Sequence, residues 1–278
     1  MRQLFLSILV ILLFNTTSLS AQSLQKELVN YCLNSDVKTL LKQLKKLEKR
    51  KDIIFDNFAY HIDYEIIDDF HAQLFEIKHT EKENANLNRI SIYRLRIIEK
   101  DNQLIFYEID KGFRNQKDIW TTKTLIIRHC GTSLFNELIK KYENLYDIKL
   151  ETLPIFNTDF LYYIPLKIDY YNCSFYKKRE ILITVVEQKN TTQLLTWLKS
   201  GNVPLQLYAI EGIFQLTEKG VSFPPNTWNW IQLVQKKEGN VRTATGCGSE
   251  KFPIYTLVQQ IKGKYGKARR KVKQAANS

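Results

Sequence analysis

Between residues 61 and 71 the chain gathers side chains that could bind a metal ion or carry out acid–base chemistry. Two histidines and four carboxylates lie within these eleven residues: His61, Asp63, Glu65, Asp68, Asp69 and His71. On a strand, His61, Asp63 and Glu65 would share one face, because side chains alternate between the two faces. Imidazole and carboxylate groups bind zinc and other divalent ions, and an Asp–His pair can also act as acid and base. We therefore take His61, Asp63 and His71 as candidate metal ligands; the alternative is a polar strand face and a turn, since the spacing matches no established metal motif.

Two segments that contain cysteine have simpler structural explanations. His129 and Cys130 are neighbours in a predicted strand, so their side chains point to opposite faces and the imidazole is out of reach of the thiol. The segment from Thr243 to Glu250 (TATGCGSE) places glycines around Cys247, which could form an anion-binding loop or expose a reactive thiol. It lacks the flanking elements and the lysine of a phosphate-binding loop. No dinucleotide, calcium, zinc-protease or serine-hydrolase motif occurs in the sequence, and we predict no cofactor.

The first 21 residues have the pattern of a cleavable secretory signal peptide. Arg2 supplies a positive start, Leu4 to Phe14 form an apolar run of eleven residues, and small residues ending at Ala21 follow. A membrane-spanning helix needs about 20 apolar residues, so this run is too short for an anchor. No later run approaches that length, and we predict a periplasmic or secreted protein with no transmembrane segment after cleavage.

Export makes the cysteines candidates for disulfide bonds. Four follow the leader: Cys32, Cys130, Cys173 and Cys247. An even number in an oxidising compartment permits two disulfides with three pairings, and the alternative is buried free thiols.

The net charge of +12 is concentrated at the C-terminus. Seven basic residues and no acidic residue lie between Lys262 and Lys273. Such a block is typical of a solvated end, and it could also adhere to an anionic surface.

Hydrophobic periodicity predicts an α+β fold. Helical spacing begins after the leader and continues through Leu47, and a change to alternation predicts an antiparallel meander between His71 and Arg128. Ser133 to Tyr146 returns to helical spacing, and Ile181 to Val186 (ILITVV) reads as a buried strand. We expect this α+β domain to span residues 22–188.

The last third predicts short helices. Gly201, Gly220 and Gly239 each follow a helical stretch that ends in lysine, the usual signal for a helix C-terminus. We expect a helical segment over residues 189–261, largely irregular after Gly239 except for a short helix near Ile254, and a basic tail over residues 262–278.

Residues 194–220 (LLTWLKSGNVPLQLYAIEGIFQLTEKG) resemble one HEAT-type helix pair. Such units generally serve as scaffolds that present binding surfaces. The chain also resembles exported proteins of Bacteroidota, whose signal peptides often end in Ala-Gln, as at Ala21-Gln22.

Together these features favour an exported, non-enzymatic binding or scaffold protein. Its expected partner is another envelope or extracellular protein, and the aromatic stretch from Phe160 to Tyr176 could form either sheet core or a contact surface. The alternative is an exported hydrolase or metal-dependent enzyme that uses the cluster from His61 to His71.

Overall fold

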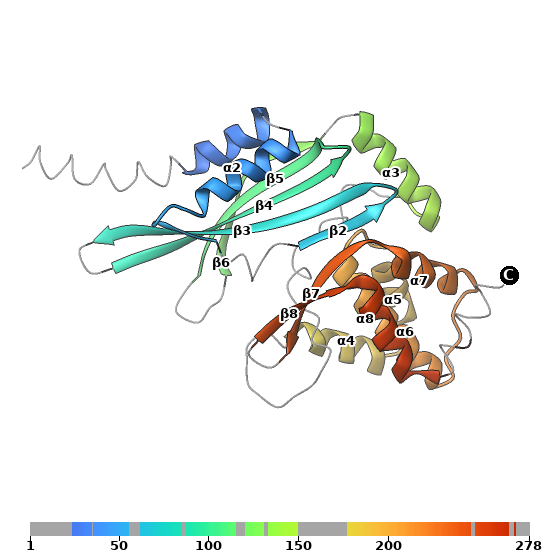
Figure 1. Ribbon diagram of the computed structural model, residues 1–278. Coiled ribbons are helices and arrows are strands. Elements are labelled where there is room, and N and C mark those ends of the chain that lie inside the picture. Colours follow the sequence, from blue (N-terminus) through green and yellow to red (C-terminus); the bar gives the residue numbers. More distant parts are fainter. Residues whose placement is uncertain are drawn as a thin grey trace, which may run out of the picture. The chain divides into compact units, whose positions relative to one another are not determined.

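The computed structural model describes residues 24–34, 36–55, 62–84, 87–114, 120–130, 133–149, 177–245, 248–266 and 270. They form helices and antiparallel strands, so the predicted α+β class is confirmed (Figure 1). Two compact units are present: unit 1 is Met1–His61 with Ala72–Phe135, and unit 2 is Ile62–His71 with Asn136–Ser278. This division differs from the expected boundary at residue 188, because α3 and α4 belong almost entirely to unit 2.

Unit 1 is built on an antiparallel meander. Its strands are β1 (Ile53–Phe55), β3 (Phe70–Asn84), β4 (Leu87–Lys100), β5 (Gln103–Arg114) and β6 (Trp120–Cys130). They lie in the order β6-β5-β4-β3, with β1 paired to β3. Asp101 and Asn102 join β4 to β5 with φ of 51° and 66°, the positive values that tight two-residue hairpin turns require. The predicted meander is confirmed.

Two helices cover one face of this sheet. The helix over residues 24–34 and α2 (Val37–Leu47) lie along the sheet (Figure 1). Their apolar side chains form one core with alternate residues of β3, β4 and β5. Asp36 caps α2, where its Oδ1 accepts a hydrogen bond of 2.7 Å from the Thr39 amide. The Asn102 side chain accepts a hydrogen bond of 2.8 Å from the Lys38 amide, which ties the start of α2 to the β4–β5 turn.

The opposite face of the same strands carries buried charge. The residues between the core positions of β3, β4 and β5 are Glu76, Arg94, Arg96, Glu108 and Asp110. Arg96 forms ion pairs with Glu108 and Asp110, and Arg94 Nε lies 3.5 Å from Glu76 Oε2. The period of two along each strand therefore separates an apolar face from an ionic one.

Unit 2 is mainly helical and contains a small antiparallel sheet. Its helices are α3 (Ser133–Tyr146, from Asn136 on), α4 (Lys177–Glu187), α5 (Thr191–Leu198), α6 (Val203–Glu218), α7 (Asn226–Lys236) and α8 (Ile254–Lys264). Strand β2 (Ile62–Ile67) pairs with β7 (Gly239–Thr245), and β7 pairs with β8 (Gly248–Pro253).

Two expectations for this unit are wrong. Residues 181–186 belong to helix α4, which buries Leu182, Val185 and Val186 at helical spacing and leaves Ile181 and Ile183 exposed. The segment after Gly239 forms the β7–β8 hairpin rather than irregular chain, and it interrupts the expected helical segment. The helix near Ile254 is confirmed as α8.

Helix α6 is the centre of unit 2. Asn202 caps it with a 3.0 Å hydrogen bond from the Leu205 amide, and helices α4, α5, α7 and α8 pack against it. A Cβ at Gly212 would lie 2.6 Å from Leu194 Cδ2, so the glycine permits the close approach of α5 to α6. The helix pair that resembles a HEAT unit is thus present, and the likeness itself stays a prediction.

Candidate functional site

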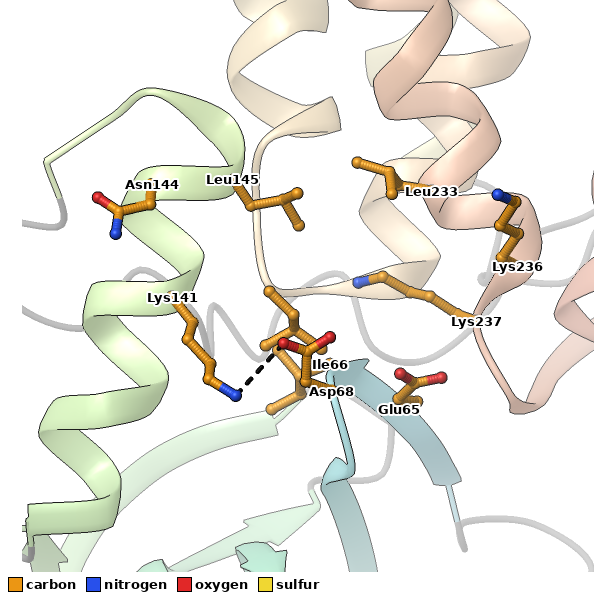
Figure 2. Close-up of a pocket in the computed structure, with 10 residues that line it drawn as sticks. Glu65, Ile66, Asp68, Lys141, Asn144, Leu145, Leu233, Lys236 and Lys237 are labelled. Carbon is orange, nitrogen blue, oxygen red and sulfur yellow. Dashed lines mark ion pairs between the residues drawn. The ribbon is translucent and has the colours of Figure 1, made fainter. Parts of the chain in front are cut away.

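A cavity of about 510 Å³ lies within unit 2 (Figure 2). Three short segments that are far apart in the sequence line it: the end of β2 with its turn, the last turns of α3, and the end of α7. The lining residues are Glu65, Ile66, Ile67, Asp68, Lys141, Asn144, Leu145, Leu233, Lys236 and Lys237. Their side chains combine four aliphatic groups with three lysines and two carboxylates.

Lys237 is held in place by the connection from α7 to β7. The helix ends at Lys236, and Lys237 adopts an extended conformation with φ of −60° and ψ of 138°. The next residue, Glu238, exchanges 3.0 Å hydrogen bonds with Glu65: its amide donates to Glu65 Oε2, and its carbonyl accepts from the Glu65 amide. The chain on either side of Lys237 is therefore fixed to a helix end and to β2.

Gly239 allows this close approach of the two segments. Its φ is 109°, and a Cβ there would lie 2.5 Å from the Asp63 carbonyl oxygen and from Tyr64 Cα. Only glycine adopts this backbone conformation without strain, and only glycine leaves room for β2. The residue that the sequence marks as a helix stop thus starts β7 and keeps Lys237 beside the cavity.

The Lys237 amine is buried without a hydrogen bond. The residue is 8% exposed, and within the described part of the chain its Nζ has no hydrogen-bond partner. The centroid of the Tyr142 ring lies 6.0 Å from Nζ. In Figure 2 the side chain extends into the cavity from the α7 side, toward Leu145 and Ile66.

Burial changes the protonation of this amine. Removal of the ammonium from water lowers the pKa of Lys237 to about 7, and the negative charge of Glu65 only partly offsets this effect. At neutral pH a substantial fraction of Lys237 is therefore an uncharged amine, unlike an ordinary lysine.

The other charged groups of the cavity have partners or lie in solvent. Lys141 Nζ lies 3.4 Å from Asp68 Oδ2 and 3.3 Å from Glu137 Oε1, and the hydrogen bond with Glu137 raises the pKa of Lys141. Lys236 is exposed, and Figure 2 shows its amine turned away from the cavity. Asp68 thus shares Lys141 with Glu137, and Glu65 accepts a hydrogen bond from the Glu238 amide.

The Tyr142 ring near Lys237 belongs to a cluster of hydrogen-bonded polar groups. The Tyr142 hydroxyl donates to the Ser200 carbonyl oxygen, and Gln206 Nε2 donates to the Tyr146 hydroxyl oxygen at 3.1 Å and to the Leu198 carbonyl oxygen at 2.9 Å. The Tyr142 and Tyr146 rings lie 4.7 Å apart. Burial raises the pKa of Tyr146 to about 12 and that of Tyr142 well above its ordinary value, so both phenols stay neutral.

The structure brings together only part of the predicted metal cluster. His71 Nδ1 lies 4.0 Å from Asp63 Oδ1, while His61 lies outside the described residues. No group of three His, Cys, Asp or Glu side chains suited to a metal ion occurs among the residues that the structure describes.

The cysteines give a similarly partial result. Cys32 is a free, buried thiol in the core of unit 1, where burial raises its pKa to about 12. A disulfide at Cys32 is therefore not formed in this structure. Cys173 and Cys247, the side chain of Cys130, the leader, the aromatic stretch and most of the basic tail lie outside the described residues.

No protein-family model matches the chain, no curated protein matches it, and no solved structure matches its fold. Over the described ranges, no helix has the length and apolar character needed to cross a membrane. The site must therefore be interpreted from its own geometry.

Sequence reasoning included Glu65 and Asp68 in a different site and missed Lys237. A lysine at the end of a helix is common, because it complements the helix dipole. The one signal was the pair Lys236-Lys237 before a glycine, and that pattern does not distinguish a solvated lysine from a buried one.

Proposed function

We propose that this chain is an exported, non-enzymatic binding protein and that the cavity of unit 2 takes up a small acidic molecule with an apolar body. The observation that carries the proposal is Lys237, a buried amine without a hydrogen bond at the wall of a cavity. A buried polar group without a partner reduces the stability of the fold, so such a group is typical of a site that a ligand completes.

The lining supports a ligand of this chemistry. A volume of about 510 Å³ lies within the range of small-molecule sites, which combine an apolar surface with a few polar groups. Ile66, Ile67, Leu145 and Leu233 would contact an apolar body. An acidic group would satisfy Lys237, since Asp68 is already paired with Lys141 and Glu65 accepts from Glu238.

Binding of an acid should be linked to proton uptake. A carboxylate beside Lys237 favours the charged ammonium and raises its pKa above the value of about 7 in the empty site. The ligand therefore binds more tightly at pH 6, where the amine is already protonated, than at pH 8, where protonation costs free energy. The difference approaches tenfold per pH unit above the pKa of the empty site.

The test uses 4-methylpentanoate as a probe and isothermal titration calorimetry at pH 6, 7 and 8. We expect binding to wild type that weakens with rising pH, and loss of most binding in Lys237→Met. Lys219→Met is the matched control, because Lys219 is exposed at the end of α6 and does not line the cavity. Absence of binding at every pH, or equal binding by the two variants, would contradict the proposal.

The metal-dependent alternative keeps one supporting observation, the approach of Asp63 to His71. It predicts zinc or another divalent ion in the purified protein and loss of that ion in His71→Ala. Elemental analysis that finds no metal in wild type at stoichiometric amounts would exclude it.

Export, an envelope or extracellular partner and adhesion by the basic tail from Lys262 to Lys273 also stay proposals. Of this tail, Lys262 and Lys264 lie in the last turn of α8.

A further inference from the structure

We propose that Lys237 captures its ligand covalently and reversibly, as an imine with the carbonyl group of a 2-oxo acid. This inference rests on the proposed function, since it concerns the same cavity and names the class of acid. It adds a chemical step that simple binding of an acid does not require.

The geometry meets the requirements of an amine nucleophile. The Lys237 side chain lines a cavity large enough for a small acid, and within the described residues its buried Nζ has no hydrogen-bond partner. Its flanking residues are fixed, because Lys236 ends α7 and Glu238 is bonded to Glu65. Buried lysines with a depressed pKa, as here, are the ones that form imines with carbonyl substrates.

The step is balanced without a further reactant. The Nζ lone pair attacks the carbonyl carbon, and the carbonyl oxygen gains a proton to give a carbinolamine. The nitrogen then loses its proton, the C–O bond breaks, and the hydroxyl leaves with a proton as water. One amine and one carbonyl thus give one imine and one water, and hydrolysis by water reverses the step with no oxidant or reductant.

The groups that face Lys237 favour an acid that carries the carbonyl. Glu65 is the carboxylate whose charge acts on Lys237, and the Tyr142 ring centroid lies 6.0 Å from Lys237 Nζ. Lys141 and Lys236 also line the cavity, but Lys141 is paired with Asp68 and Glu137 and the Lys236 amine turns away (Figure 2), so the protonated imine at Lys237 would itself be the cation beside the ligand carboxylate. Asp68 is held by Lys141 and does not oppose the ligand. The aliphatic side chains leave space for a branched or short alkyl chain beyond the carbonyl.

The experiment compares two acids of the same carbon skeleton. Wild-type protein is incubated with 4-methyl-2-oxopentanoate and sodium cyanoborohydride, and the reduced adduct is located by mass spectrometry of the intact protein and of its peptides. We expect one adduct, on Lys237, at a yield at least about tenfold above that of any ordinary lysine, which is almost fully protonated at pH 7.5. Lys237→Met should lose the adduct, and Lys219→Met should keep it.

A second measurement uses wild type alone, so that the inference can be tested even if Lys237→Met does not fold. The rate of labelling of Lys237 should rise with pH and reach half of its maximum near pH 7, while labelling of exposed lysines continues to rise toward pH 10. Labelling spread over many lysines, or a Lys237 profile like that of the exposed lysines, would overturn the inference.

The acid without a 2-oxo group, 4-methylpentanoate, distinguishes the proposed binding function from the proposed covalent step. If 4-methylpentanoate binds in a Lys237-dependent manner and the oxo acid gives no adduct, the covalent step is wrong and the binding function stands. If neither acid binds or reacts, both proposals fail. If the adduct forms selectively on Lys237, the covalent step is supported whether or not the saturated acid binds tightly.

Discussion

The two units of this chain both bury charged side chains, but they treat them differently. In unit 1 the buried Arg96 forms ion pairs with Glu108 and Asp110, and Arg94 lies beside Glu76. In unit 2 the amine of Lys237 is equally inaccessible and, within the described residues, has no hydrogen bond. Both arrangements remove ionisable groups from water, which costs free energy. Each therefore requires an explanation of what offsets that cost.

Under the proposed function, this difference separates a structural role of the charges in unit 1 from a role of Lys237 in binding. Pairing across neighbouring strands offsets the cost of burying these charges within unit 1. The burial of Lys237 is not offset by a hydrogen bond within the described residues, and the residue lines a cavity. The proposed ligand would supply the missing partner. Substitution should therefore have opposite effects on stability in the two units, and this contrast can be measured.

The largest effect is expected at Arg96. Arg96→Met leaves Glu108 and Asp110 buried without their guanidinium, and breaking a buried pair in this way costs about 3–5 kcal/mol in the free energy of unfolding. Urea denaturation of the variant and of Lys45→Met, an exposed control on α2, provides the measurement. A loss at Arg96 no larger than that of the control would show that the buried ion pairs contribute little.

The ionic face of unit 1 was only partly predictable from the sequence. Alternation correctly predicts the strands, and the hairpin turn at Asp101-Asn102 follows from residues that tolerate positive φ. Alternation does not show whether a strand is buried on one face or on both. The structure buries both faces of β4 from Ser91 to Ile98, and Arg94 and Arg96 there pair with carboxylates of the neighbouring strands.

The errors have identifiable physical causes. Residues 181–186 form a short apolar run rich in β-branched side chains, and periodicity alone does not distinguish a buried strand from a helix over six residues. The β7–β8 hairpin was missed because its sequence contains the glycines of a loop. The cavity joins residues 65–68, 141–145 and 233–237, and no local pattern shows that these segments meet.

The next largest effect is expected at Lys237 and has the opposite sign. Lys237→Met replaces a buried amine by an apolar group of similar length, and loss of an unsatisfied polar group should raise the free energy of unfolding by about 1–3 kcal/mol at pH 7. Urea denaturation measures the change, with Lys219→Met as the control. A destabilised Lys237→Met would mean that the amine has a structural role, and the contrast between the units would disappear.

The difference in stability between Lys237→Met and wild type should also depend on pH. The pKa of Lys237 is about 7 in the folded state and near its ordinary 10.5 in the unfolded state, so between these values the unfolded chain binds more protons. The contribution of Lys237 to the stability of wild type therefore rises with pH from about 7 to about 10. The advantage of Lys237→Met over wild type should shrink across this window, and a constant advantage would contradict a depressed pKa.

The smallest effect is expected at a charged network of unit 1 that solvent reaches. Asp52 Oδ2 lies 2.7 Å from Arg50 Nη2 and 3.2 Å from His79 Nε2, and its side chain is 39% exposed. The hydrogen bond from Arg50 lowers the pKa of Asp52 to about 2, so its contribution is present above about pH 4 and is lost as the pH falls through 2. Because water screens the pair, Asp52→Asn should lower the free energy of unfolding by less than about 1 kcal/mol at pH 7.

Thermal unfolding at pH 7 and at pH 2 measures this effect. The variant should be slightly less stable than wild type at pH 7 and nearly equal to it at pH 2. We expect the burial of an ion pair, rather than the number of ion pairs, to determine its contribution to the stability of unit 1. A loss in the free energy of unfolding as large as that of Arg96→Met would contradict this view.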